Sequence, residues 1–416
     1  MPAWLIICIT AVSALTLFTA PITIWTAVTI IIGLFKNKET DVEINKYYKF
    51  SVLICARNEQ NVIGNLIESL KLQDYKGEFK IYVVADNCTD ETAEMAKNLG
   101  AHVFVRNNLN FIGKGYAMQY GIDQILKENP VAEAICVFDA DNLASQSFLT
   151  EVNIAFNAGA DVVSGYRDTK NIHESWVSEV YSIYWLMLMR FYYNPRYVLG
   201  LFPMVGGTGF AFLTSCLKDK GWHTCTLTED VEFSIQQILE GNKIMPANKA
   251  VFYDEQPGTL KDSFKQRLRW MTGGIQCLKI YFKQVFRGII GGRKNLWDIL
   301  WYLFFIPATG LTLILNVLSV IVVYAAPALS EYSALFVLTV LTASILLAWF
   351  VAYATLKLEK RNIKAMKRAI ILYPLFIFTM MIVALFALFN PKAEWLPIKH
   401  SNSVTIQDRE KERQKD

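Results

Sequence analysis

Apolar residues gather at the two ends of the chain. No residue between Ala3 and Phe35 is charged, and this run suits one tilted helix across a bilayer, which takes about 20 residues, but is short for two. It is too long for a secretory signal peptide, and no basic residue precedes it. Further apolar stretches follow at Leu296–Ala325, Ala334–Leu356 and Ala369–Phe389. The pattern therefore predicts a membrane segment in residues 1–38 and about three C-terminal transmembrane helices in residues 296–390.

Between these ends the pattern alternates between strand and helix. Short apolar runs predict strands at Lys49–Ala56, Phe79–Ala85, Ala101–Val105, Ala134–Phe138 and Asp161–Gly165. Helical spacing of apolar residues separates the first two strands, and a second helix is expected to begin near Glu91. Strands that alternate with helices indicate a mainly parallel sheet with right-handed crossovers. Residues 39–274 are therefore expected to form an α/β nucleotide-binding domain.

Acidic residues follow two of these strands. Asp86 comes at the end of the second strand, and Asp139 and Asp141 come at the end of the fourth. In a parallel sheet, ligands bind beyond the carboxyl ends of the strands. Carboxylate oxygens suit Mg²⁺ or Mn²⁺, with diphosphate oxygens completing the coordination. We therefore expect a Mg²⁺ or Mn²⁺ site at Asp139 and Asp141. The alternative is a pair of loop aspartates that cap a helix.

Two further motifs lie on predicted helices. Glu229 and Asp230 precede an apolar helical pattern, where an acid can act as a general base or simply cap the helix. Gln266, Arg269 and Trp270 share one helical face because they lie three and four residues apart. Arginine suits a diphosphate and tryptophan offers a flat face to a sugar ring, although both residues are also common in helices at a membrane surface. Residues 275–295, which mix apolar and basic side chains, are expected to form an interfacial amphipathic helix.

In order and in kind, these motifs resemble the D, DxD, TED and QxxRW signatures of the family 2 glycosyltransferases. The resemblance is closest to the membrane-embedded polysaccharide synthases, such as the cellulose, hyaluronan, chitin-oligosaccharide and poly-N-acetylglucosamine synthases. It covers roughly Phe50 to Gly274 by motif, and it implies a GT-A-like domain inserted between α-helical transmembrane segments. One departure is Ala85-Asp86-Asn87, where many relatives carry Asp-Asp or Asp-Gly.

The resemblance implies a role for each motif residue. Asp230 would be the general base, with Glu229 in support. The nucleotide-sugar would be bound by Glu59, Asp86, Lys114, Asp139 and Arg269, where Lys114 could equally be an exposed loop lysine. The acceptor would lie against Gly207, Thr208, Gln266 and Trp270. A single base without a nucleophile implies inversion, so that an α-linked donor yields a β-linked product.

The function that follows is an inverting transferase that takes a UDP-sugar and extends a β-linked polysaccharide without releasing it between steps. A non-processive enzyme with a lipid acceptor, such as diacylglycerol or a polyprenyl phosphate, is the alternative, and a non-catalytic transporter or scaffold is a third reading. Membrane lipids and an accessory membrane subunit are expected partners. Nucleic acid is not an expected partner, because the net charge of +4 is unremarkable and the basic residues are not clustered.

Basic residues in short loops indicate the orientation in the cell membrane. Lys36 and Lys38 follow the first apolar run, and basic residues crowd Lys357–Arg368, whereas Pro327–Tyr332 has none. This places the catalytic domain in the cytoplasm and the Pro327–Tyr332 turn outside. With four spans the tail, residues 391–416, would lie outside, although it is basic. A break of the first run at Pro21 would change that count. The polar tail is expected to be partly disordered.

Overall fold

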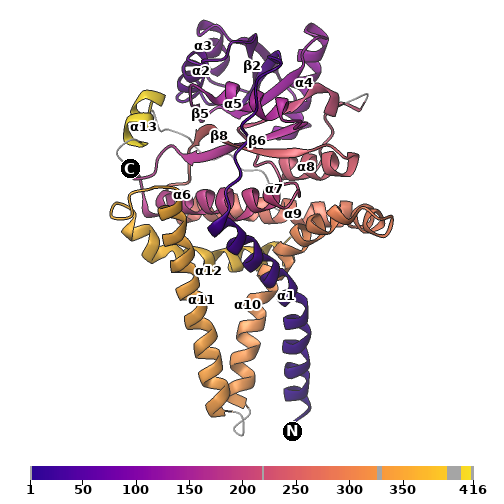
Figure 1. Cartoon of the computed structure of the whole chain (residues 1–416), viewed down its shortest axis with the longest axis vertical. Coiled ribbons are helices and arrows are strands. Elements are labelled where there is room, and N and C mark those ends of the chain that lie inside the picture. The colour runs from indigo at the N-terminus through magenta and orange to yellow at the C-terminus, as the bar shows by residue number, and fades with distance from the viewer. Residues whose placement is uncertain (1, 218–219, 326–329, 391–403, 414–416) are drawn as a thin grey trace.

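The computed structural model describes residues 2–217, 220–325, 330–390 and 404–413. An α/β domain lies at one end of the molecule, and long helices extend from it at the other (Figure 1). The domain is built on one sheet of eight strands in the order β3-β2-β1-β4-β7-β6-β8-β5. The Pro327–Tyr332 turn falls partly outside the described residues.

The first half of the sheet is parallel, as predicted. Strand β1 (Phe50–Ala56) pairs in parallel with β2 (Phe79–Asp86) and β4 (Ala134–Asp139), and β2 pairs in parallel with β3 (His102–Arg106). Strands β1 and β4 and the second half of β2 are buried on both faces, which is why they read as continuous apolar runs, whereas β3 at the edge of the sheet exposes Val105. The carboxyl ends of β2 and β4 therefore lie at one edge of the sheet and bring Asp86 and Asp139 to the same side of the domain.

The second half of the sheet is mixed. Strand β7 (Phe210–Leu213) is antiparallel to both β4 and β6 (Val162–Thr169), β8 (Ile244–Asp254) is parallel to β6, and β5 (Leu143–Ala144) is antiparallel to β8. The sequence did not predict β5, β7 or β8. Strands β5 and β7 are short, and Asn248 and Lys249 interrupt the apolar pattern of β8.

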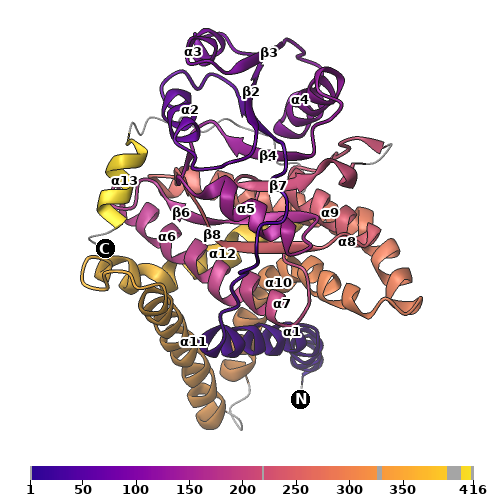
Figure 2. The same cartoon turned by 45° about the horizontal axis from the view of Figure 1, so that its top comes forward.

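Helices cover both faces of the sheet (Figure 2). One core cluster packs α4 (Lys114–Glu128) and α8 (Glu229–Glu240) against the sheet, and the other packs α2 (Ile63–Lys71), α3 (Thr92–Asn98) and α5 (Phe148–Asn157). A third cluster joins the sheet to α6 (Trp176–Leu188), α9 (Leu260–Ile290) and α12 (Lys367–Phe389). Short helical turns complete the domain: η1 (Met189–Tyr193), α7 (Asn194–Val198), η2 (Thr214–Cys216) and η4 (Lys294–Leu296).

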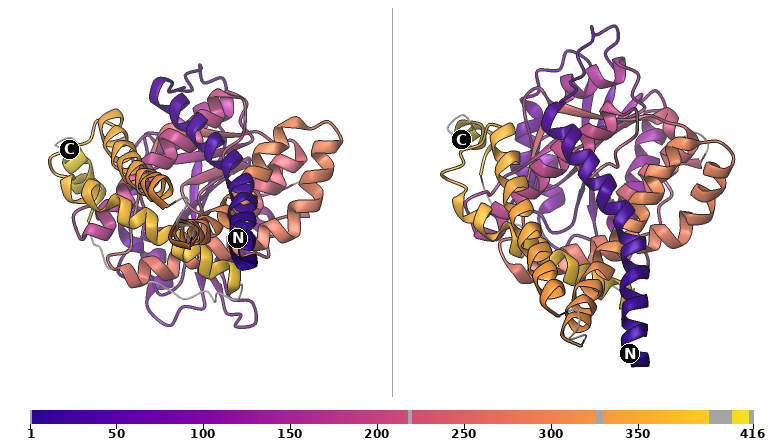
Figure 3. Two further views of the ribbon diagram at one scale, coloured as in Figure 1. Left: turned by 90° about the horizontal axis from the view of Figure 1, so that it is seen from below. Right: turned by 60° about the horizontal axis from the view of Figure 1, so that its bottom comes forward.

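Four helices are long and apolar enough to cross a membrane: α1 (Ala3–Phe35), α10 (Trp297–Ala325), α11 (Ser330–Leu358) and α12. Helix α1 runs without a break through Pro21, so the alternative of two short crossings does not arise. Helices α1, α10 and α11 extend away from the domain. In contrast, α12 lies across their direction, beneath α6 and α9 (Figures 1 and 3). Its apolar composition alone could not show this difference.

The packing of α12 explains its position. One face is buried at a helical spacing of three and four residues, at Ala369, Tyr373, Phe376, Met380 and Val383. Its other face exposes large apolar side chains, among them Ile371, Leu375 and Phe378. Arg267 of α9 donates to Thr379 Oγ1 at 2.8 Å, and Arg368 forms a hydrogen-bonded ion pair with Glu179 of α6. These contacts hold α12 flat against the catalytic domain.

Two segments differ from the sequence prediction. Helix α9 continues unbroken from the motif Gln266–Trp270 through the segment expected to be a separate interfacial helix, so no structural boundary falls at residue 275. Part of the polar tail is ordered as α13 (Ile406–Arg413). Ile406 is buried, Arg409 donates to the Thr169 carbonyl at 2.9 Å, and Arg413 lies 3.8 Å from Asp168. The part of the tail that the structure describes therefore packs against the catalytic domain.

Candidate active site

A single cavity of about 790 Å³ collects the motif residues. It is lined by Glu59, Asp86, Lys114, Asp139, Asp141, Gly207, Glu229, Asp230, Gln266, Arg269 and Trp270. Of the predicted site residues, only Thr208 is not among the lining residues of this cavity. The cavity begins at the carboxyl ends of the parallel strands and continues between α1, α10 and α12. The four motifs, although far apart in the sequence, thus face one space.

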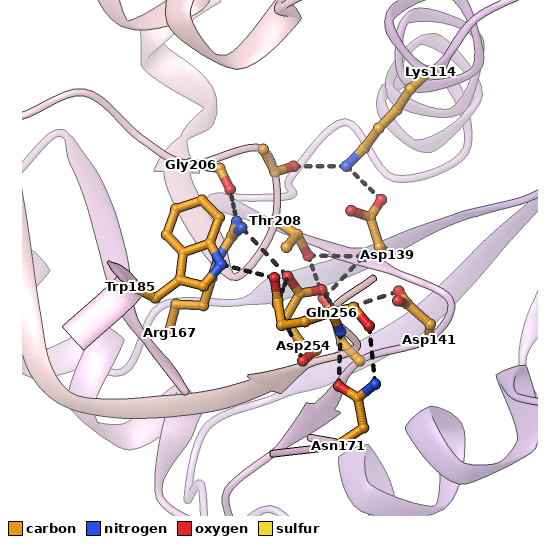
Figure 4. A network of polar contacts seen from close by, with 12 residues as sticks. Lys114, Asp139, Asp141, Arg167, Asn171, Trp185, Gly206, Thr208, Asp254 and Gln256 are labelled. Atoms are coloured by element: carbon orange, nitrogen blue, oxygen red, sulfur yellow. Dashed lines mark hydrogen bonds and ion pairs between the residues drawn. The ribbon is translucent and has the colours of Figure 1, made fainter. Parts of the chain in front are cut away.

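Thr208 lies beside Asp139 (Figure 4) and is not among the residues that line the cavity. Its hydroxyl accepts a hydrogen bond from the Asp139 amide at 2.8 Å and donates one to Asn142 Oδ1. The Asn142 side chain in turn donates to Asp254 Oδ1 at 2.8 Å. Since its hydroxyl is used on both sides, Thr208 holds the backbone at Asp139, and a contact with the acceptor stays a prediction.

Asp254 adds a third carboxylate that sequence reasoning missed. It ends β8, and burial raises its pKa to about 6, because the charges of Asp141 and Asp139 add to desolvation and outweigh the opposing guanidinium of Arg167. Arg167 lies 3.4 Å from Asp254 Oδ2 and also donates to the Gly206 carbonyl. Figure 4 shows these groups converging on the end of β4. The region is therefore rich in negative charge.

Lys114 supplies positive charge in the midst of these carboxylates. Its ammonium group lies 2.5 Å from Asp139 Oδ1 and donates to the Gly207 carbonyl at 2.6 Å (Figure 4). Burial lowers the pKa of Lys114, but the neighbouring Asp139 and Glu229 outweigh burial and leave it above its usual value. Lys114 is therefore a charged lysine inside the site and not an exposed loop residue.

The oxygen atoms of Asp139 and Asp141 are suitable ligands for a divalent cation. Asp139 exposes 36% of its side chain, and the backbone carbonyl of Asp141 is held at 3.1 Å by the buried ammonium of Lys170. Among the described residues, no three acidic, histidine or cysteine side chains are grouped closely enough to hold a metal by themselves. Diphosphate oxygens of a bound donor would have to complete the coordination of an ion held by Asp139 and Asp141.

Asp86 is held by an arginine that the sequence did not single out. Arg106, at the end of β3, lies 2.5 Å from Asp86 Oδ1 and also donates to the Phe111 carbonyl at 2.8 Å. Both side chains are buried, so this pair fixes the orientation of the Asp86 carboxylate. An arginine at a strand end normally reads as a surface residue, and only the parallel pairing of Asp86 with Arg106 brings them together.

Glu229 and Asp230 occupy the first turn of α8. Burial and the adjacent Asp230 raise the pKa of Glu229 to about 7, against the opposing charges of Lys114 and Arg269. Burial also raises the pKa of Asp230, although a backbone hydrogen bond from Val231 and the cations Lys114 and Arg269 oppose it. A raised pKa suits a group that must accept a proton near neutral pH.

Gly207 gives Asp230 access to the cavity. Its φ of +68° lies in the left-handed region, and a Cβ at this position would stand 3.3 Å from Asp230 Oδ2. A larger residue here would strain the backbone and crowd the carboxylate. The glycine-rich turn therefore leaves an open approach to the Asp230 carboxylate.

Helix α9 brings its motif to the same space by close packing. A Cβ at Gly273 would come within 2.5 Å of the Thr228 side chain, so glycine permits α9 to lie directly against the loop before α8. Arg269 donates to the Leu227 carbonyl at 3.3 Å, and the Trp270 ring lies 5.5 Å from that of Trp185. The Gln266 Oε1 atom is buried, and none of the described residues offers it a hydrogen bond. That oxygen is available to a ligand.

Residues 48–273, more than half of the chain, match the model of "Glycosyltransferase like family 2". The chain is 26% identical over 260 residues to a β-monoglucosyldiacylglycerol synthase of a Nostoc species (61% of this chain, 54% of the relative). It is 25% identical over 249 residues to a poly-β-1,6-N-acetyl-D-glucosamine synthase of Staphylococcus aureus (58% of each chain). The chain thus spans little more than half the length of these relatives.

A solved structure shares the fold over nearly the whole molecule. The mannosyltransferase PcManGT from Pyrobaculum calidifontis, in complex with GDP-Man and Mn²⁺, is matched with a TM-score of 0.60 at 14% identity, over 92% of this chain and 98% of that one. This likeness confirms the predicted GT-A-like fold with its flanking helices. With the family match and the shared cavity of the four motifs, it leads to one conclusion: this chain belongs to glycosyltransferase family 2.

Proposed function

We propose that the protein is an inverting glycosyltransferase that moves a sugar from a UDP-sugar to a hydroxyl group reaching the site from the membrane side. The observation that carries this proposal is the single cavity, which runs from Asp139 and Asp230 to the apolar faces of α1, α10 and α12. The acceptor oxygen forms its bond to the anomeric carbon as the bond to the diphosphate breaks, and Asp230 takes the acceptor proton.

The other charged residues have complementary tasks in this proposal. Lys114 and Arg269 flank the acids and stabilise the negative charge of the departing nucleoside diphosphate. Asp86, fixed by Arg106, and Glu59 bind the nucleoside end of the donor. A Mg²⁺ or Mn²⁺ ion at Asp139 and Asp141 would supply Lewis-acid neutralisation of the diphosphate when bound. Because Asp230 is the only base assigned and no nucleophile is, one displacement inverts the anomeric centre.

Two acceptors fit this chemistry. A growing β-linked polysaccharide, extended without release, is favoured by Trp270, which lines the cavity beside Trp185 and can stack on a sugar ring. A lipid hydroxyl is favoured by the apolar continuation of the cavity. Both acceptor classes occur among the relatives named above, one of which makes a polysaccharide and the other a glucosyldiacylglycerol.

UDP release tests the proposal directly. Purified full-length protein should release UDP from at least one of UDP-glucose, UDP-N-acetylglucosamine, UDP-galactose and UDP-glucuronate, and a membrane extract should increase that release by supplying the acceptor. Radiolabelled donor then shows the product size: label in long chains supports polymer synthesis, and label on a lipid with one or two sugars supports the lipid acceptor. Absence of UDP release with all four donors would refute the UDP-sugar assignment.

Trp270→Ala is expected to lower the rate of transfer by about 2- to 10-fold, because an aromatic contact contributes about 0.5–1.5 kcal/mol beyond burial. If chains are made, the variant should also shorten them. Donor hydrolysis should fall less than transfer does. Trp4→Ala, which removes a half-exposed tryptophan far along α1 from the site, serves as the control. Equal losses in transfer and hydrolysis would argue against a sugar-stacking role.

The arrangement of the helices leads to a topology proposal. Helices α1, α10 and α11 would cross the cell membrane and α12 would lie at its cytoplasmic surface, which places the catalytic domain and the basic tail together in the cytoplasm. This arrangement agrees with the positive-inside rule, because the basic segment Lys357–Arg368 and the basic tail would both lie in the cytoplasm. An accessory membrane subunit remains compatible with this arrangement.

Cysteine labelling tests this topology. In a Cys8→Ala background, a cysteine at Ser330 should react with an impermeant thiol reagent in intact cells, whereas cysteines at Asn362 and at Gln407 should react only after permeabilisation. Asn362 and Gln407 are both exposed. Labelling of Gln407→Cys in intact cells would mean that α12 crosses the bilayer, and labelling of Asn362→Cys would invert the whole arrangement.

A further inference from the structure

The C-terminal helix α13 is bound to the α/β domain by side chains that the proposed function does not use. Ile406 is 4% exposed and belongs to the same buried cluster as Ile172 and Tyr253, and Arg409 is 0% exposed. Figures 1 and 2 show α13 against the side of the α/β domain. A polar helix of 8 residues is not stable by itself in water, so its contacts with the domain must hold it in place.

The contacts of α13 converge on the carboxyl end of β6. Arg409 Nε donates to the Thr169 carbonyl at 2.9 Å, and Arg413 Nε lies 3.8 Å from Asp168 Oδ2. Asp168 is buried and also pairs with Arg361 at 2.5 Å. Burial alone would raise the pKa of Asp168, but the three guanidinium groups outweigh burial and hold the pKa below its usual value. Asp168 is therefore a buried charge that attracts the two arginines of the tail.

The same strand end forms a wall of the active site on its other side. Successive side chains of a strand point to opposite faces, and Arg167 lines the cavity whereas Asp168 contacts the tail. The residue that follows β6 is Lys170, whose side chain is buried and donates to the Asp141 carbonyl at 3.1 Å. The strand end thus lies between the tail and the loop that carries the proposed metal ligand.

We infer that α13 positions the donor site through the end of β6, with Arg409 and Lys170 as its positioning residues. This inference rests on the proposed function and specifies how the site for the nucleotide-sugar and its divalent ion is held. Arg409 fixes the carbonyl of Thr169, and Lys170, the next residue, fixes the backbone of Asp141. Displacement of α13 would release this strand end and let Asp141 move away from the ion and the diphosphate.

The position of the acceptor site makes the inference specific. Asp230 and Trp270 lie on α8 and α9, whereas the contacts of Arg409 and Arg413 described above are with β6. Loss of these contacts should therefore weaken the binding of the donor and its ion and leave the acceptor site intact. A helix that only stabilises the fold would affect both sites alike.

The first test removes the hydrogen bond between the tail and the strand. In full-length Arg409→Gln, the dissociation constant of Mn²⁺ in the presence of UDP, followed by electron paramagnetic resonance, should rise about tenfold, since groups that hold metal ligands in place contribute about 10- to 100-fold to metal affinity. The control is Lys411→Gln, which removes the same charge from an exposed position of α13 and should bind like the wild type. Unchanged affinity in Arg409→Gln would overturn the inference.

The second test uses two other variants of the full-length protein. Ile406→Asp places a charge in the buried cluster and should detach α13, whereas Gln407→Asp changes an exposed neighbour and is the control. Lys170→Met removes the contact with Asp141 directly. Ile406→Asp and Lys170→Met should both raise the KM for the UDP-sugar about tenfold, with a much smaller change in kcat and in the KM for the acceptor.

The outcomes of these tests separate the inference from the proposed function. The measurements are made at a temperature at which the circular dichroism of each variant equals that of the wild type. A fall in kcat alone, or an equal rise of the KM values for donor and acceptor, would overturn the positioning role. If the wild type itself releases no UDP from any donor, the proposed function is refuted. If it does and the variants keep its KM for the donor, only the role of α13 is refuted.

Discussion

Replacing Asp230 with asparagine is expected to lower the rate of sugar transfer by about 10²–10⁴-fold, the usual contribution of a general base. The amide keeps the shape of the carboxylate but cannot accept the acceptor proton. Donor affinity should change little, because Lys114, Asp139 and Arg269 remain to bind the nucleotide-sugar. Single-turnover transfer rates and UDP-sugar binding, measured on the same preparation, separate the two effects.

A matched control is Asp123→Asn, which changes an exposed acid of α4 that does not line the cavity. It should retain full activity. If Asp230→Asn instead loses donor binding and keeps its rate at saturating donor, Asp230 is a binding residue. In that case Glu229, whose pKa of about 7 also suits proton transfer, becomes the candidate base.

Removal of the divalent ion is expected to abolish transfer. Excess chelator should stop the reaction, and added Mg²⁺ or Mn²⁺ should restore it, because the diphosphate then leaves with its charge neutralised. Asp141→Asn should lose activity that metal cannot restore, since a neutral amide is a weaker ligand than a carboxylate. Binding of Mn²⁺ in the presence of UDP, followed by electron paramagnetic resonance, should weaken in the same variant.

The control for the ion is Asp74→Asn, at an acid outside the cavity, which should bind Mn²⁺ like the wild type. Full activity in excess chelator would contradict the metal assignment. In that case Lys114, which already lies against Asp139, would be the cation that faces the diphosphate.

The sequence predicted those features that depend on neighbouring residues. The apolar runs of β1, β2 and β4 predicted buried parallel strands, because strands covered on both faces have no polar alternation. From that sheet it followed that Asp86 and Asp139 would meet at one edge. The membrane-length apolar segments and the helix of the Gln266–Trp270 motif were predicted for the same reason, since their length and spacing are local properties.

The features that the sequence left undetermined are contacts between distant segments. Arg106 pairs with Asp86 through the register of β2 and β3, Asp254 and Arg167 join the site from strands β8 and β6, and Thr208 turns its hydroxyl toward the backbone of Asp139. Arg106, Asp254 and Arg167 have no local pattern that marks them, and Thr208 was expected to lie against the acceptor and not to hold the backbone at Asp139. Their roles follow from which strands lie side by side.

The long apolar helices show most clearly the difference between what the sequence predicts and what only the tertiary structure shows. Composition made α1, α10, α11 and α12 equivalent candidates for crossing a bilayer. Only the packing of α12 against α6 and α9, with Arg267 bound to Thr379 and Arg368 to Glu179, distinguishes it from the others. The sequence by itself therefore determined which segments avoid water, because hydrophobicity belongs to each residue. The tertiary structure alone decided which of them lies against the domain and which extend away from it, because that depends on partners far away in the chain.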